Sequence, residues 1–354
     1  MNNTFLFDTG LTDHHLALIK DRYNQVKELP LHRVLVEKSI PLLEEQDNKA
    51  LFLLFDQGFK ELGPLYPLVL MYCLYPTTVG LYDRLGIPEA IRQATLSDTG
   101  LWVKTYENQH RGLTGLDRYG WICRDLCAKV LRLGRLEFEQ DPFRFPYSIY
   151  YDRQLMRYRA FAQDSLVCTD GGYIGNSSGS VTGAGSWSTT CSSDDTLLFA
   201  HEVDQGLGII SRTPIEIPLA DLTNICTKDT LVLSVHIPEG EPLTPSLVDA
   251  SFSLAQAMYS PTLFVCDSWL LDPELSLVLP PESNICHFMQ RFKKFPVSFS
   301  TPQIYERVFG FDATQSDIEA WECTTSLQKK VQAHILGGGI FRTMGGYIPV
   351  PNGT

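Results

Sequence analysis

The stretch Leu233–Tyr259, LSVHIPEGEPLTPSLVDASFSLAQAMY, joins an apolar run to a loop with three prolines and two glutamates, and then to an amphipathic segment. The apolar run carries no charge, which is typical of a strand that is covered on both faces. Thr244 followed by Pro245 favours a helix start, because threonine caps free N–H groups and proline suits the first helical position. A strand–loop–helix unit is therefore predicted, and four helix residues are expected to form its packed face: Leu247, Ser251, Leu254 and Met258.

The opening between this strand and its helix is a candidate binding site. Free backbone N–H groups and the positive end of the helix dipole meet there, so an anion or a polarised carbonyl can be held. His236 stands next to last in the predicted strand and is expected to project near the opening. It is either a histidine packed in the core or a general base that works near neutral pH. Glu239 and Glu241 either serve as orienting or basic carboxylates or face water.

The first 134 residues are predicted to form a helical domain. A first helix is expected to start at Thr12, and a second helical segment ends before Gly63. The clearest pattern lies in residues 115–134, GLDRYGWICRDLCAKVLRLG, which predict one helix that Gly134 ends. Five residues of this segment fall on one face at helical spacing: Tyr119, Ile122, Leu126, Val130 and Leu133. No strand is expected before Gly134.

Residues 135–354 are predicted to form an α+β domain. RLEFEQ at 135–140 alternates apolar residues with Glu137 and Glu139, as a half-buried strand does. Further strands are expected at 147–153, 155–161, 196–203, 230–237, 262–269 and 305–311, with helices at 283–292 and 324–339. Thr325 and Gln328 have the spacing of a capping box. The Gly/Ser-rich segment 170–194 predicts a hairpin insertion rather than a phosphate loop, and its Trp187 is placed to fold over a ligand.

Composition limits the class of protein. With 44% apolar and 20% charged residues the chain can bury sizeable cores, and its net charge of −12 argues against nucleic acid or an anionic membrane as partner. No apolar run approaches the length of a membrane span, and MNNTFLFDTG lacks the features of a signal peptide. The nine cysteines contain no C-x-x-C pair, which predicts reduced thiols, a cytoplasmic location and no metal site.

Several segments resemble a family of bacterial two-domain proteins. They are VHIPEGEPLTPSLVDASFSLAQA, CDSWLLDPELSLVLPPESNICHFMQRF, VFGF and TTSLQKKVQAHILGGGIFR. Members of that family pair a helical acyltransferase-type N-terminal domain with a C-terminal domain that resembles the GNAT acetyltransferase fold. The resemblance spans most of residues 120–345, and it implies a boundary at 134/135 between a helical N-terminal domain and a GNAT-like mixed-sheet domain.

This resemblance implies acyl transfer from acetyl-CoA or another acyl-CoA to an amine of a small-molecule acceptor. GNAT-type enzymes hold the carbonyl at a splayed central strand and the pyrophosphate at the start of the next helix, while a histidine or carboxylate removes the amine proton. By position, His236 is the expected base, and Glu239 or Asp267 the carboxylate that orients it. The donor is expected at the loop and helix start that contain Gly240 and Thr244.

Polar residues just past the strand at 262–269 extend this candidate site. Asp267 either caps a turn or belongs to the site, and Trp269 either packs or binds substrate together with Asp272. Asn284 and Arg291 lie seven apart on one predicted helix face. Arg291 belongs to the densest basic cluster of the chain, so it either binds a phosphate or ends a solvated helix.

A second function stays open, because PEGEP at 238–242 replaces the glutamine or arginine and spaced glycines that are usual before the GNAT helix. Two carboxylates beside a pyrophosphate oppose its charge. The alternative is a non-catalytic ligand-binding or regulatory protein that keeps the fold without CoA chemistry. A Ser268–His236–Asp272 hydrolase is disfavoured, since no nucleophile-elbow motif surrounds a serine.

Overall fold

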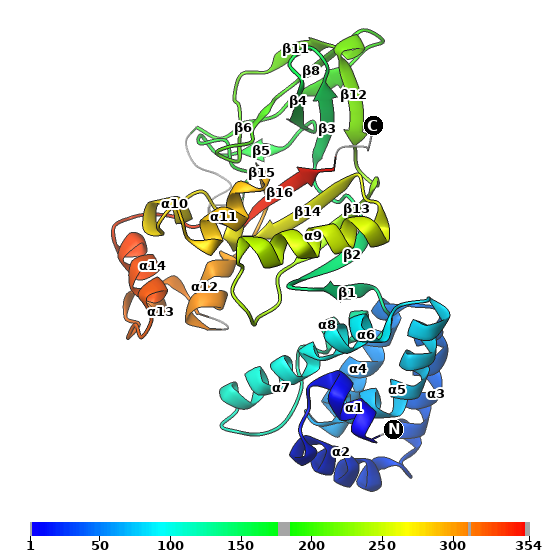
Figure 1. The fold of residues 1–354 in the computed structure, drawn as a ribbon. Coiled ribbons are helices and arrows are strands. Elements are labelled where there is room, and N and C mark those ends of the chain that lie inside the picture. Colours follow the sequence, from blue (N-terminus) through cyan, green and yellow to red (C-terminus); the bar gives the residue numbers. More distant parts are fainter. Residues whose placement is uncertain (1, 176–184, 311–312, 351–354) are drawn as a thin grey trace. The chain divides into compact units, whose positions relative to one another are not determined.

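The computed structural model describes residues 2–175, 185–310 and 313–350 (Figure 1). Its internal contacts divide the chain into two compact units. The helical unit comprises Met1–Gln140, His236–Glu241 and Ala250–Ala255, and the sheet unit comprises Asp141–Val235, Pro242–Asp249 and Gln256–Thr354. The domain boundary expected at residue 134 stays a prediction.

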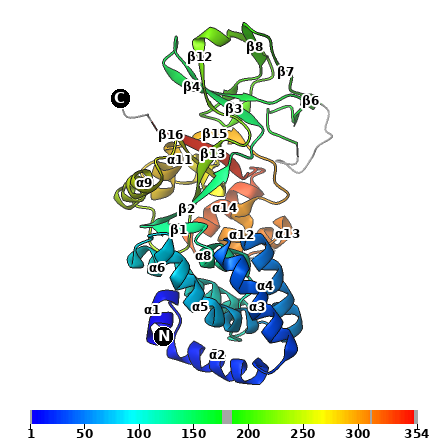
Figure 2. The ribbon, with the colours of Figure 1, turned by 90° about the vertical axis from the view of Figure 1, so that its right-hand side faces the viewer.

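The helical unit is built from eight helices that enclose one apolar core (Figures 1 and 2). They are α1 (Asn2–Thr9), α2 (Asp13–Val26), α3 (Pro30–Glu44), α4 (Asn48–Leu62), α5 (Tyr66–Arg84), α6 (Glu89–Leu96), α7 (Asp98–Gln109) and α8 (Tyr119–Leu126). The central helix is α5, in which Leu68, Val69, Leu70 and Met71 are fully buried. A helix that is apolar nearly all round must be enclosed by its neighbours, as α5 is.

Local sequence signals set several helix ends as predicted, although the helix that starts after Thr12 is the second, because α1 precedes it. The hydroxyl of Thr12 accepts a hydrogen bond from the backbone N–H of His15, which caps α2. α4 ends at Leu62, and Gly63 follows with φ 88°, a conformation that favours glycine. These interactions join residues a few positions apart, so the sequence alone identifies them.

The segment predicted as one helix up to Leu133 is a helix followed by a strand, so that prediction was wrong. α8 ends at Leu126, and Ala128 has φ 50°, which interrupts helical geometry. β1 (Val130–Leu133) then pairs with β2 (Leu136–Pro142) in an antiparallel hairpin. The apolar residues of β1 fit the helical period as well as the strand, and pairing with the adjacent β2 decides between the two.

Two smaller expectations about this hairpin were also wrong. Gly134, expected to end a helix, lies in the hairpin turn with φ 72°. Glu137 and Glu139, expected on a solvent face, are only 5% and 7% exposed. Both glutamates are covered because they contact charged side chains of the helical unit, which the alternation of polar and apolar residues cannot reveal.

The sheet unit contains a run of four strands in the order β13-β14-β16-β15. β13 (Leu231–His236) and β14 (Leu263–Ser268) are parallel, with Leu233 opposite Phe264 and Ser234 opposite Val265. β16 (Met344–Pro349) runs antiparallel to β14 and to β15 (Lys293–Pro296). The parallel pair is joined by α9 (Pro245–Tyr259), which begins after Thr244 as predicted.

Smaller sheets precede β13 in the chain and form the green part of Figure 1. One contains β12 (Leu222–Cys226), β3 (Tyr147–Asp152) and β4 (Arg157–Ala162), and another contains β11 (Ile215–Pro218), β8 (Leu197–Ala200) and β7 (Cys191–Ser193). Two-stranded pairs join β10 (Ile209–Ile210) to β9 (Val203–Asp204) and β5 (Val167–Cys168) to β6 (Trp187–Ser188). A 3-10 turn, η1 (Leu219–Asp221), lies between β11 and β12. A second, η2 (Trp269–Leu271), directly follows β14.

Helices α10 (Leu275–Val278), α11 (Asn284–Gln290), α12 (Gln303–Phe309), α13 (Gln315–Glu319) and α14 (Ser326–Leu336) enclose an apolar cluster of their own. α11 and α14 were predicted, and Thr325 with Gln328 forms the expected capping box. The strand expected at 305–311 was wrong, because Gln303–Phe309 is helical. There Ile304 is buried in the cluster and Val308, four residues later, packs against it, a spacing that suits one face of a helix.

The packed face predicted for α9 was also wrong in part. Leu247, Leu254 and Met258 are 38%, 51% and 40% exposed, whereas Ser251 is fully buried. The buried apolar residues are instead Val248 and Ala255. Small residues at this face let the helix lie close to its neighbours, and the larger apolar side chains face outward.

The predicted insertion at 170–194 is described in part. β5 and β6 pair antiparallel, while residues 176–184 lie outside the described residues. Trp187 does not lie free: its indole N–H donates to Thr169 O at 2.9 Å and its ring is 5.0 Å from that of His201. Among described helices, none combines the length and apolarity needed to cross a membrane.

Candidate functional site

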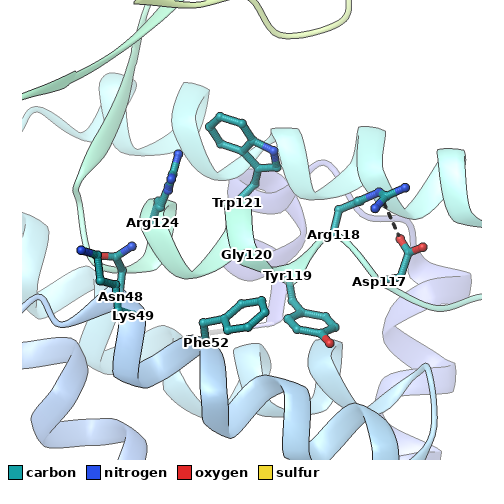
Figure 3. A pocket seen from close by; sticks show the side chains of 9 residues that line it. All are labelled: Asn48, Lys49, Phe52, Asp117, Arg118, Tyr119, Gly120, Trp121 and Arg124. Atoms are coloured by element: carbon teal, nitrogen blue, oxygen red, sulfur yellow. Dashed lines mark ion pairs between the residues drawn. The ribbon is translucent and has the colours of Figure 1, made fainter. Parts of the chain in front are cut away.

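A cavity of about 590 Å³ lies in the helical unit, between the first turns of α4 and α8 (Figure 3). Asp47 caps α4, because its side chain accepts a hydrogen bond from the backbone N–H of Ala50. α8 begins after an irregular segment that ends at Arg118. The cavity mixes aromatic, cationic and amide side chains. Its lining residues are Asn48, Lys49, Phe52, Asp117, Arg118, Tyr119, Gly120, Trp121 and Arg124.

His236 lies beside a wall of this cavity. Its ring meets the indole of Trp121 edge-on, with centroids 5.1 Å apart and planes at 76°. Its Nε2 is 3.3 Å from Oε2 of Glu139 and has no hydrogen bond to any described residue. The imidazole is 19% exposed, so it is neither sealed in the core nor free in solvent. Nε2 itself is buried against Glu139, so the accessible part of the ring lies away from that nitrogen.

Glu139 connects His236 to a cation of the cavity. Its Oε2 is also 3.3 Å from Nη1 of Arg124, whose guanidinium lies 4.8 Å above the ring of Trp121. The side chain of Glu139 is 9% exposed. A buried carboxylate between a guanidinium and an imidazole can orient the ring and stabilise its protonated form.

Four further carboxyl groups are buried among the described residues of the same unit: Asp8, Asp98, Asp125 and Glu137. Burial, reinforced by a hydrogen bond to Asp98, raises the pKa of the Glu137 carboxyl well above its usual range. Burial and the nearby charge of Asp98 likewise raise the pKa of Asp125. Asp98 is ion-paired with Arg132. The raised pKa favours the protonated form of Glu137, which donates a hydrogen bond to Asp98 of the Asp98–Arg132 pair.

Replacing Glu137 with glutamine tests this assignment. The folded protein holds the Glu137 proton more tightly than the unfolded chain, so its stabilising contribution is complete below about pH 4.3 and declines as pH rises toward the raised pKa. Glutamine keeps a donor for Asp98 and has no proton to lose. The melting temperature of Glu137→Gln, relative to the native protein, is therefore expected to increase between pH 5 and pH 8. A relative melting temperature that stays constant with pH would contradict a protonated Glu137.

The loop after His236 is fixed by a buried arginine. Nη1 of Arg135 donates to Pro238 O at 2.9 Å, and its Nε donates to Glu241 O. Gly240 has φ 135°, which favours glycine at this point of the loop. Glu239 and Glu241 are exposed. A guanidinium beneath the loop offsets part of the negative charge that the two glutamates bring to it.

Thr244 precedes α9 in extended conformation, and its side chain makes no capping hydrogen bond. Arg291 lies near this first turn: it is ion-paired with Asp249, and its Nη2 is 3.4 Å from Pro245 O. Arg291 follows α11, and Asn284 is the first residue of that helix. Arg291 thus contacts the start of α9, and the donor and substrate roles expected of Gly240, Thr244, Asn284 and Arg291 stay predictions.

The remaining predicted residues follow β14. Asp267 pairs with Arg144 at 2.8 Å. Asp272 is 1% exposed and accepts hydrogen bonds from the backbone N–H groups of Arg342 at 2.5 Å and Glu274 at 3.1 Å. Trp269 packs against the apolar cluster of α10–α14. These contacts are those of structural residues, and the substrate roles of Trp269 and Asp272 stay predictions.

Sequence reasoning missed Glu139, Trp121 and Arg124. The one available signal was the pair of glutamates in RLEFEQ, which was interpreted as a solvent face. Trp121 and Arg124 were interpreted as part of a helix, which is correct but says nothing about their neighbours. Among the described residues, no three His, Cys, Asp or Glu side chains gather into a group that could hold a metal ion.

Comparisons with known proteins agree with the two-part organisation. Residues 4–128 match the family model "N-acyltransferase N-terminal domain", and residues 130–348 match "GNAT-like C-terminal domain". No curated protein matches the sequence.

Solved acyltransferase structures resemble the chain in fold. One, in complex with CoA and 10C-teicoplanin, has a TM-score of 0.55 at 16% identity, and the match covers 95% of this chain and 84% of that one. Another, in complex with decanoyl-CoA and teicoplanin, has a TM-score of 0.50 at 17% identity, with 99% of both chains covered. A third, with decanoyl-CoA, has a TM-score of 0.49 at 20% identity and 80% of this chain covered. The chain spans 65% of that third protein, slightly less than two thirds.

Proposed function

Because the chain belongs to the family that joins an N-acyltransferase N-terminal domain to a GNAT-like C-terminal domain, we propose that it transfers an acyl group from an acyl-CoA to an amine. The observation that carries the proposal is His236, whose unbonded Nε2 faces Glu139 beside a cavity wall. A family match gives the class of reaction, and this histidine supplies the group that the reaction needs.

In the proposed reaction His236 is the general base. The amine nitrogen attacks the thioester carbonyl, a C–N bond forms, and the C–S bond breaks. His236 accepts at Nδ1 the proton that the amine loses, since Nε2 is buried against Glu139, and the imidazolium then gives this proton to the departing CoA thiolate. Glu139 is a positioning residue, because its carboxylate lies 3.3 Å from the imidazole and stabilises the charge that the ring acquires. This assignment replaces the orienting role predicted for Glu239 or Asp267, of which the latter pairs with Arg144.

The donor is proposed to bind at the loop from Ile237 to Thr244 and at the first turn of α9. The helix start offers free N–H groups to the pyrophosphate. Arg135 donates hydrogen bonds to two backbone carbonyl groups of the loop. Arg132 lies 3.7 Å from the position that a β-carbon on Gly240 would occupy. Two arginines close to the loop counter the repulsion expected from Glu239 and Glu241.

CoA binding is the test of this proposal. CoA at about 100 times its Kd should stabilise the folded protein by about 2.7 kcal/mol, measured as a thermal shift. Arg135→Lys keeps the charge but loses the planar fork that holds two carbonyls, so it should weaken the shift. Lys38→Ala, an exposed change on α3, should leave the shift unchanged.

The absence of a shift at millimolar CoA would contradict the donor site. It would favour a ligand-binding protein that keeps the GNAT-like fold without CoA chemistry, as the two exposed glutamates of the loop suggest. The proposed acceptor is a small molecule with a free amine. Teicoplanin, named with two of the solved acyltransferases, is a ligand of those proteins.

A further inference from the structure

The cavity between α4 and α8 has a positive lining in an otherwise acidic chain. Lys49, Arg118 and Arg124 line it with a single carboxylate, Asp117, although the chain has a net charge of −12, and Arg124 is also paired with the buried Glu139. Asp117 lies 4.0 Å from Nε of Arg118, at the limit of an ion pair. Lys49 is exposed and has no ion pair with any described residue. This balance suits a ligand with a negative group.

The same cavity offers flat apolar surface. Phe52 is 39% exposed, and its ring lies 5.4 Å from that of Tyr119 at 34°. Gly120 lies next to this ring, since a β-carbon there would be in ordinary van der Waals contact with Phe52 at 3.5 Å, and a longer side chain would cover it. An exposed aromatic ring beside a position without a side chain can stack with an aromatic group of a ligand.

Trp121 connects the cavity to the proposed base. Figure 3 shows Trp121 and Arg124 projecting to one side of Gly120, with Phe52 and Tyr119 on the other. Trp121 lines the cavity and contacts the ring of His236. A ligand in the cavity therefore lies against Trp121, the residue that contacts the proposed base.

We propose that this cavity binds the acyl acceptor, and that the acceptor is an amine that carries an aromatic ring and a carboxylate, as aromatic amino acids do. The proposal rests on the acyltransferase function proposed above. The ring stacks at Phe52, and the carboxylate pairs with Lys49. The cations of the cavity also disfavour a neighbouring ammonium, so they promote the neutral amine that attacks the thioester.

Calorimetric titration with three probes tests the proposal. L-Phenylalanine has the ring, amine and carboxylate, phenethylamine lacks the carboxylate, and L-alanine lacks the ring. Phenylalanine is expected to bind about tenfold or more tightly than either of the others, since each loses one charge-assisted or stacking contact. Equal binding of all three, or binding of none, would overturn the assignment.

Two matched substitutions locate the site. Gly120→Leu, in α8, fills the space over Phe52 and should abolish phenylalanine binding. Gly80→Leu is the same change on α5, where a β-carbon meets nothing within 4 Å, and should leave it unchanged. Phenylalanine binding that survives Gly120→Leu would overturn the proposal.

CoA binding, measured on the same preparations by thermal shift, separates the two proposals. A protein that binds CoA but no aromatic carboxylate refutes the acceptor site alone. A protein that binds phenylalanine in a Gly120-dependent way but not CoA refutes the acyltransferase and leaves the ligand class of the cavity in place.

Discussion

His236→Ala is expected to lower kcat for amine acylation about 100-fold or more, with little change in CoA affinity. The imidazole is the proposed proton acceptor, and general-base catalysis by a positioned side chain contributes about 10²–10⁴-fold. Its Nε2 has no hydrogen bond to a described residue, so its removal leaves no buried partner unsatisfied apart from Glu139 at 3.3 Å. Release of the CoA thiol measures turnover, and the thermal shift measures CoA binding.

Two variants complete this experiment. His236→Gln keeps a polar side chain of similar reach without a basic nitrogen, so its loss of turnover should match that of alanine. His14→Ala, at an exposed position of α2, should leave turnover unchanged. Turnover that persists in both His236 variants would remove this residue from the reaction, and the proposed mechanism with it.

Asp272→Ala is expected to lower the free energy of unfolding by about 2–4 kcal/mol. Its carboxyl is buried and accepts two backbone hydrogen bonds, so alanine leaves two N–H groups of Arg342 and Glu274 without acceptors, at about 1–3 kcal/mol each. Urea unfolding measures the loss. Asp267→Ala, which breaks only the partly exposed pair with Arg144, should cost about 1 kcal/mol or less.

The loss at position 272 should also depend on pH. Burial raises the pKa of the Asp272 carboxyl to about 7. The folded protein therefore binds this proton more tightly than the unfolded chain, whose pKa is about 3.9, and the resulting stability is lost as pH rises through 7. The difference between native protein and Asp272→Ala should be larger at pH 5 than at pH 8. Similar losses for Asp267→Ala and Asp272→Ala would contradict the structural role.

Local interactions explain what could be predicted from the sequence. The cap of Thr12 on α2, the end of α4 before Gly63 and the Thr325–Gln328 box of α14 each join residues within one helical turn or at a helix end. The apolar runs that became β13 and β14 were identified for a similar reason, since a buried strand must be apolar along its length.

Predictions were wrong where one pattern fits two structures. Val130–Leu133 continues the helical spacing of α8, and only its pairing with β2 makes it a strand. Gln303–Phe309 carries residues typical of a strand, but burial of Ile304 and Phe309 in a cluster of helices makes it helical. In each case the secondary structure depends on a packing or pairing partner elsewhere in the chain, which the spacing of apolar residues does not identify.

By itself the sequence determined the class of fold, a helical part followed by an α+β part, and it selected His236 as the residue to examine. Only the tertiary structure placed Glu139 and Trp121 against that histidine and formed the cavity between α4 and α8. The physical reason is the separation along the chain between the residues that interact. Helix caps and apolar periodicity act between residues close in the chain, whereas His236 meets side chains about a hundred positions away, whose contact depends on how the whole unit packs.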